Sequence, residues 1–103
     1  MRISVTSGRG ISNRKILIET NKYFGCKNAF GFYQRVIPIE AEGFVVIVCP
    51  YSVTFDIYNK EKCQQKTIKN FLEYVFRGKT IGVSVNQKCD WIDQLDNINI
   101  KYI

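Results

Sequence analysis

The chain has 103 residues, of which 46% are hydrophobic and 14% aromatic, and its formal net charge is +6. This length suits one small domain, and the apolar content can fill a core, so a two-domain protein and a disordered chain are both excluded. Neither a run of about 18 apolar residues nor the apolar segment of a signal peptide is present, so the sequence predicts a cytoplasmic protein without a membrane span.

The chain contains no histidine and four widely spaced cysteines, Cys26, Cys49, Cys63 and Cys89. Without histidine there is no Ser-His or Cys-His pair, so hydrolysis by the familiar nucleophilic routes is not expected. A zinc site would need all four cysteines, and no C-x-x-C pair is present, so we expect free thiols and no metal. Whether the chain catalyses a reaction of its own stays open.

A short strand is expected at Arg2–Val5, followed by a basic loop and then by a helix from Ser12 to Phe24 that ends at Gly25. A strand that runs into a helix N-terminus is a natural anion site, because free N–H groups and the helix dipole favour negative charge there. Two interpretations of the loop are open. It is either a surface turn with Ser12 as N-cap, or a phosphate-binding loop built from Thr6, Ser7, Gly8, Arg9, Gly10, Ser12 and Asn13.

Tyr33–Glu40 is expected to be an edge strand, because Pro38 cannot donate a ladder hydrogen bond. The unbroken apolar run over residues 43–49 indicates a strand that is buried on both faces, which is typical of the centre of a parallel sheet. We expect Pro50 to end this strand and residues 50–59 to form a loop.

The clearest helix has one apolar stripe at helical spacing, with lysines on its other side and Arg77 and Gly78 at its end. The stripe consists of Ile68, Phe71, Leu72, Val75 and Phe76. A strand at Thr80–Val85, a polar segment that contains Trp91, and a last strand at Asn97–Ile103 follow.

This order of elements predicts a single domain, residues 1–103, with a reduced flavodoxin-like fold: a doubly wound parallel α/β sheet of strand order 2-1-3-4-5. The alternative is a ferredoxin-like α+β fold, in which residues 33–49 form an antiparallel hairpin. The two-sided burial expected for residues 44–48 favours the first.

In the flavodoxin-like fold, three loops meet at one edge of the sheet: residues 6–13, 50–59 and 86–91. The first loop offers hydrogen-bond donors that can bind a phosphate. The other two contain aromatic residues, namely Tyr51, Phe55, Tyr58 and Trp91. A flat ring cofactor that carries a phosphate needs both kinds of group, so the three loops together predict such a site.

Several stretches of the chain match, in their order and spacing, corresponding stretches of one known family. They read Val5–Asn13, Val36–Ile39, Phe44–Tyr51, Ile68–Leu72 and Arg77–Lys88. In these stretches the chain resembles the NrdI family, the small flavodoxin-like FMN proteins that accompany class Ib ribonucleotide reductases.

The resemblance implies an electron-transfer flavoprotein that supplies oxidant or electrons to the dimanganese radical subunit of ribonucleotide reductase. It implies FMN as the cofactor, with the redox chemistry belonging to the flavin. The implied binding residues are Thr6, Ser7, Gly8, Arg9, Gly10, Ser12, Asn13, Tyr51, Ser84, Asn86 and Trp91.

The alternative function is a small basic binding protein without a cofactor, which acts on nucleic acid or on a partner protein. The charge of +6 supports it, and the composition would also suit a phage protein. No recognised nucleic-acid motif is present and the basic residues are scattered along the chain, so we expect no specific nucleic-acid partner.

Overall fold

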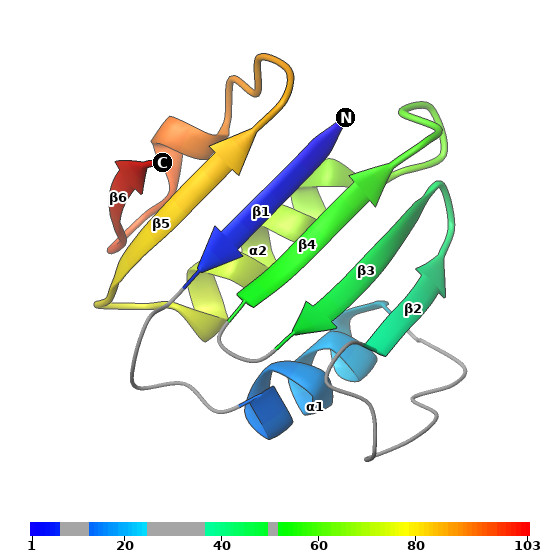
Figure 1. Ribbon diagram of the computed structural model, residues 1–103, viewed down its shortest axis with the longest axis horizontal. Coiled ribbons are helices and arrows are strands. Elements are labelled where there is room, and N and C mark those ends of the chain that lie inside the picture. Colours follow the sequence, from blue (N-terminus) through cyan, green and yellow to red (C-terminus); the bar gives the residue numbers. More distant parts are fainter. Residues whose placement is uncertain (7–12, 25–36, 50–51) are drawn as a thin grey trace.

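The computed structural model describes residues 1–6, 13–24, 37–49 and 52–103. A six-stranded sheet carries two helices on one of its faces (Figure 1). In chain order the elements are β1 (Arg2–Thr6), α1 (Asn13–Phe24), β2 (Ile37–Ala41), β3 (Phe44–Cys49), β4 (Ser52–Ile57), α2 (Gln65–Val75), β5 (Thr80–Val85), the 3₁₀ turn η1 (Ile92–Gln94) and β6 (Asn99–Tyr102).

The strand order is β2-β3-β4-β1-β5-β6, and every neighbouring pair is antiparallel except β5 with β6. The prediction of a flavodoxin-like parallel sheet of order 2-1-3-4-5 is therefore wrong. β4 is the reason, because it returns the chain antiparallel to β3 before α2 begins. α2 then links β4 to β5, which run parallel with β1 between them, as in a split βαβ unit.

The hairpin that the ferredoxin-like alternative required is present, as β2 paired antiparallel with β3. β2 lies at the edge of the sheet, as Pro38 predicts. A two-residue turn joins the strands, and its Gly43 has a φ of 86°. A Cβ there would lie 2.7 Å from both the Asn59 oxygen and the Cys63 nitrogen, so only glycine fits without a shift.

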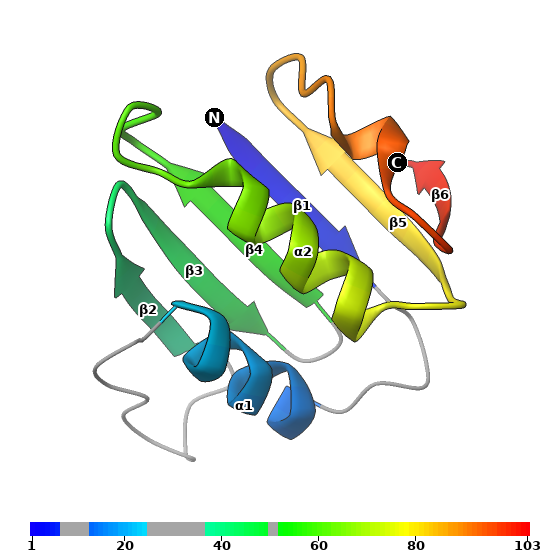
Figure 2. The same cartoon turned by 180° about the vertical axis from the view of Figure 1, so that it is seen from behind.

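β3 is not buried on both faces, contrary to the prediction. Phe44, Val46 and Val48 are buried, whereas the alternate side chains Val45 and Ile47 are half-buried. Both helices cover the same face of the sheet, so the other face of β3 meets no helix (Figure 2). A continuous apolar run therefore arises here from a strand that is covered on one side only.

The core lies between the sheet and α2, which crosses β1 and β4 (Figure 2). All five residues of the predicted helix stripe are buried, and Gly78, at a φ of 73°, follows the helix end as expected. The ring of Phe71 on α2 meets the ring of Phe55 on β4 edge to face, with centroids 5.8 Å apart. Tyr23 of α1 meets Phe71 in the same way at 5.6 Å, so one aromatic cluster joins both helices to the sheet.

Candidate functional site

The flavin site predicted from the sequence is only partly within the described residues. Ser7, Gly8, Arg9, Gly10, Ser12 and Tyr51 lie outside them. Thr6 ends β1, Asn13 begins α1, Ser84 lies on β5, and Asn86 and Trp91 follow β5.

The predicted meeting of three loops at one edge is wrong, because β1 runs antiparallel to both of its neighbours. Thr6, where the first loop starts, is level with Ser52 and Gly82. Asn86, where the third loop starts, accepts a hydrogen bond of 2.7 Å from the backbone nitrogen of Arg2. Arg2 and Thr6 are the two ends of β1, about 13 Å apart at the usual strand rise.

The remaining predicted residues also lie apart. Ser84 is exposed in β5, whose side chains alternate between the two faces of the sheet. Trp91 is half-buried against the core, and its Nε1 donates a 2.8 Å hydrogen bond to Oε1 of Gln65, the first residue of α2. Phe55 is fully buried in the core and offers no ring to a ligand. The described flavin-site residues are thus divided between the two ends of the sheet.

A different set of residues is brought together on α2. Its buried stripe faces the sheet, so the residues between the stripe positions face solvent (Figure 2). Lys62, Lys66 and Arg77 are exposed and Lys69 is half-exposed, and the ring of Tyr74 is 58% exposed beside them. We call these five residues, which run from just before α2 to just after it, the basic helix surface.

The cations of this surface form no ion pair within the described part of the chain. The ion pairs found there join Arg2 to Asp56, Lys22 to Glu19, and Lys88 to Asp90, and none of them includes a residue of the basic helix surface. Lys15 and Lys22 of α1 are also exposed, and α1 packs against α2, so positive charge continues across the helix layer.

The placement of these lysines does not favour the helix itself. The first turn of α2 has no acidic residue, and its N-cap Gln64 makes no side-chain capping hydrogen bond. Acidic residues stabilise the N-terminus of a helix and basic residues oppose its dipole. Lys62 and Lys66 therefore add positive potential to an end that is already positive. The sequence shows these lysines beside the apolar stripe, and reading them on a helical projection would have found this surface.

A surface cavity of about 250 Å³ adjoins the C-terminal half of α2. It is lined by Asn70, Glu73, Tyr74, Arg77, Asp96 and Asn97. The backbone nitrogen of Asp96 donates a 2.7 Å hydrogen bond to Oε2 of Glu73, and the nitrogen of Gly78 donates one of 2.7 Å to the oxygen of Asn97. These bonds fix the loop that forms one wall of the cavity against the helix that forms the other.

Three of the four cysteines lie within the described residues, and they are free thiols. Cys63 and Cys89 are buried, and burial raises the pKa of both thiols, so they stay protonated and weakly nucleophilic. Cys49 is half-buried at the end of β3. No group of three or more metal-ligating side chains occurs in the ranges that the structure describes. These thiols thus act as packing residues and not as a reactive centre.

Comparison of the chain with protein-family models, with curated proteins and with solved structures found no match. Over the described ranges, no helix has the length and apolar character that crossing a membrane requires. The basic helix surface and the cavity beside it form the candidate site among the described residues.

Proposed function

We propose that the protein is a small, cofactor-free binding module that holds nucleic acid through phosphate contacts of the basic helix surface. The observation that carries this proposal is the alignment of Lys62, Lys66, Lys69 and Arg77 along α2 with no ion-pair partner among the described residues. We interpret the framework as ferredoxin-like, because β1, α1, β3, β4, α2 and β5 follow the βαββαβ order, with β2 and β6 as added edge strands.

The chemistry of the surface suits a phosphate backbone. The 11 residues of α2 span about 16 Å, and Lys66, Lys69 and Tyr74 lie on successive turns. Lysines contact phosphates as point charges and do not discriminate bases, so these phosphate contacts are independent of sequence.

The open face of the sheet does not compete for this role. RNA-binding sheets of the same βαββαβ order stack bases on aromatic side chains. On β1 the side chains that alternate with buried Ile3 and Val5 are Arg2, Ser4 and Thr6. On β4 the corresponding side chains are Ser52, Thr54 and Asp56, so these central strands present no aromatic ring to solvent.

Binding of FMN and interaction with the radical subunit of ribonucleotide reductase stay predictions. Part of their support was the flavodoxin-like strand order, which the sheet does not have. Titration of the protein into FMN separates the two hypotheses. We expect the flavin fluorescence to stay unchanged, and saturable quenching would restore the redox module as the first candidate.

The experiment that tests the binding proposal is a salt titration of nucleic-acid affinity. We expect a dissociation constant of about 1–100 µM at physiological salt, with a log–log slope of about −0.9 for each phosphate contact in duplex DNA. The double variant Lys66→Glu/Lys69→Glu loses two contacts, so its affinity falls about tenfold or more and its slope becomes shallower.

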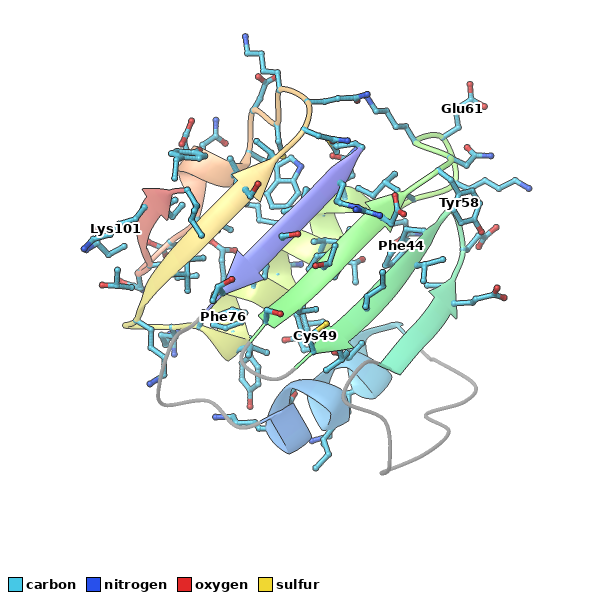
Figure 3. The ribbon with its side chains drawn as sticks, viewed as in Figure 1. Phe44, Cys49, Tyr58, Glu61, Phe76 and Lys101 are labelled. Atoms are coloured by element: carbon cyan, nitrogen blue, oxygen red, sulfur yellow. The ribbon has the colours of Figure 1, made fainter. Side chains whose placement is uncertain are left out.

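The matched control is Lys88→Glu/Lys101→Glu, which changes the net charge equally at exposed sites outside α2. Lys101 lies on β6, at the far edge of the sheet (Figure 3). This control should keep most of the affinity and the full slope. Equal losses in the two double variants would mean that total charge, and not the basic helix surface, governs binding.

A further inference from the structure

We propose that the cavity beside α2 receives one unstacked nucleobase, so that the surface prefers single-stranded nucleic acid and favours bases that carry an exocyclic amino group. This inference rests on the proposed function and adds a base subsite to it. The carrying observation is that an exposed aromatic ring, a cation and two carboxylates line one cavity: Tyr74, Arg77, Glu73 and Asp96.

Tyr74 supplies the stacking surface. The residue is 58% exposed, and it lines the cavity. The ring also contacts that of Tyr23, with centroids 6.0 Å apart and planes at 39°, and the ring of Tyr23 in turn meets that of the buried Phe71. The ring is therefore supported from the core while a large part of it stays open to a base, as in proteins that bind single strands.

The polar groups of the cavity favour a particular set of bases. Glu73 and Asp96 have carboxylates, which only accept hydrogen bonds. Oε2 of Glu73 already accepts a hydrogen bond from the backbone nitrogen of Asp96. Cytosine, adenine and guanine present amino groups that donate to such acceptors. Thymine and uracil present a carbonyl oxygen where cytosine carries its amino group, so a carboxylate facing that edge finds no donor.

Arg77 connects the cavity to the basic helix surface. It is exposed, it lines the cavity, and it follows the helix that carries Lys66 and Lys69. A single nucleic-acid strand that is bound by the lysines would thus pass Arg77 and place one base beside Tyr74. A duplex cannot place a base there without unpairing it, which costs free energy. The single strand is therefore the preferred ligand.

The first test compares binding of oligo(dC) with binding of a DNA duplex, at a mildly alkaline pH where cytosine is neutral. Tyr74→Ala should weaken oligo(dC) binding about fivefold or more and leave duplex binding unchanged, whereas Tyr74→Phe keeps the stacking face and the affinity. Tyr58→Ala is the matched control, because Tyr58 is a 69% exposed tyrosine that follows β4 and does not line the cavity (Figure 3). It should bind both ligands as the wild type does.

The second test measures the ratio of the affinities for oligo(dC) and oligo(dT). Glu73→Gln keeps an oxygen for the Asp96 nitrogen but adds a donor, so the preference for oligo(dC) should fall, and the ratio cancels the general effect of the lost charge. Thermal unfolding of each variant shows whether it is folded as the wild type is.

The outcomes separate this inference from the proposed function. If oligo(dC) and duplex bind equally, or if Tyr74→Ala behaves as Tyr58→Ala does, the base subsite is wrong. Salt-dependent binding that still falls in Lys66→Glu/Lys69→Glu would leave the proposed function intact in that case. If none of the nucleic acids binds at low salt, both proposals are overturned.

Discussion

The two faces of the sheet are built from the same strands but differ in what they present. Towards the helices, β1 and β4 bury Ile3, Val5 and Phe55. The outer side of α2 carries Lys66 and Lys69, which have no ion-pair partner among the described residues. On the open face, the alternate side chains of β1 and β4 are hydroxyls and the ion pair between Arg2 and Asp56. Among the described residues, Lys62, Lys66, Lys69 and Arg77 thus form a group of like charges along α2.

The polar groups of the open face satisfy one another across the strands. Ser4 and Thr54 share a hydrogen bond of 3.0 Å between their hydroxyl oxygens, and Nη2 of Arg2 lies 3.3 Å from Oδ2 of Asp56. Both members of the ion pair are about half exposed, so the pair contributes little to stability. On this face the central strands β1 and β4 therefore offer neither an aromatic ring nor an unpaired charge.

The largest difference between the faces should be seen in stability. Phe55→Ala removes a fully buried ring that packs on Phe71, so the free energy of unfolding should fall by about 3–5 kcal/mol. Its neighbour Thr54 faces the other side, and Thr54→Val removes only the hydrogen bond to Ser4, which should cost about 1 kcal/mol or less. Urea unfolding measures both values. Similar losses in the two variants would mean that the open face is covered in solution.

A smaller effect is expected in the reactivity of the cysteines. Cys63 and Cys89 are buried and their pKa is raised by that burial, whereas Cys49 is half-buried on β3. In a Cys26→Ser background, Cys49 should react with a thiol reagent about tenfold faster than the other two, since rate follows thiolate fraction and access. In denaturant all three should react alike. Slow reaction of Cys49 in the folded protein would contradict its partial exposure.

The smallest expected effect is a change in the pH dependence of stability, which comes from Tyr102 on β6. Tyr102 donates a hydrogen bond to Oδ1 of Asp93, which raises the pKa of its phenol from 10.0 to about 12. The folded state therefore keeps a proton that the unfolded state loses. The stability from this group is fully present below pH 10.0 and is lost as the pH rises through about 12.

Tyr102→Phe lacks this group, so its stability should fall less steeply over the same range. Urea midpoints of the two proteins at about pH 9 and about pH 11 measure the difference. Parallel pH dependence in wild type and variant would show that the hydrogen bond to Asp93 does not persist in solution.

Local patterns in the sequence predicted most of the individual elements. The stripe of Ile68, Phe71 and Val75 identified α2, and Pro38 identified β2 as an edge strand, because each depends only on neighbouring residues. β4 was missed, although Ser52–Ile57 alternates between buried and half-buried residues as a strand does. Residues 50–59 were predicted to form a loop, so this alternation was not interpreted as a strand.

The strand order could not be read in the same way, because pairing joins residues far apart in the chain. Ile3 pairs with Phe55 and with Val85, and no local pattern specifies either partner. If β4 is missed, α2 is taken to connect β3 to β5, and this connection predicts a parallel sheet. The predicted flavin site depended on that sheet. The basic helix surface depended only on α2, so its lysines could have been grouped from helical spacing alone.

The most direct test of the account is a map of the backbone amide NMR shifts as a short single-stranded oligonucleotide is added. The account predicts that the largest changes fall on residues 62–77 and on Asp96 and Asn97, and that they shrink as salt is raised. Ser4, Thr54 and Ser84 of the open face should hardly change. Changes that concentrate on these three residues, with residues 62–77 unmoved, would contradict the claim that the helix layer is the binding face.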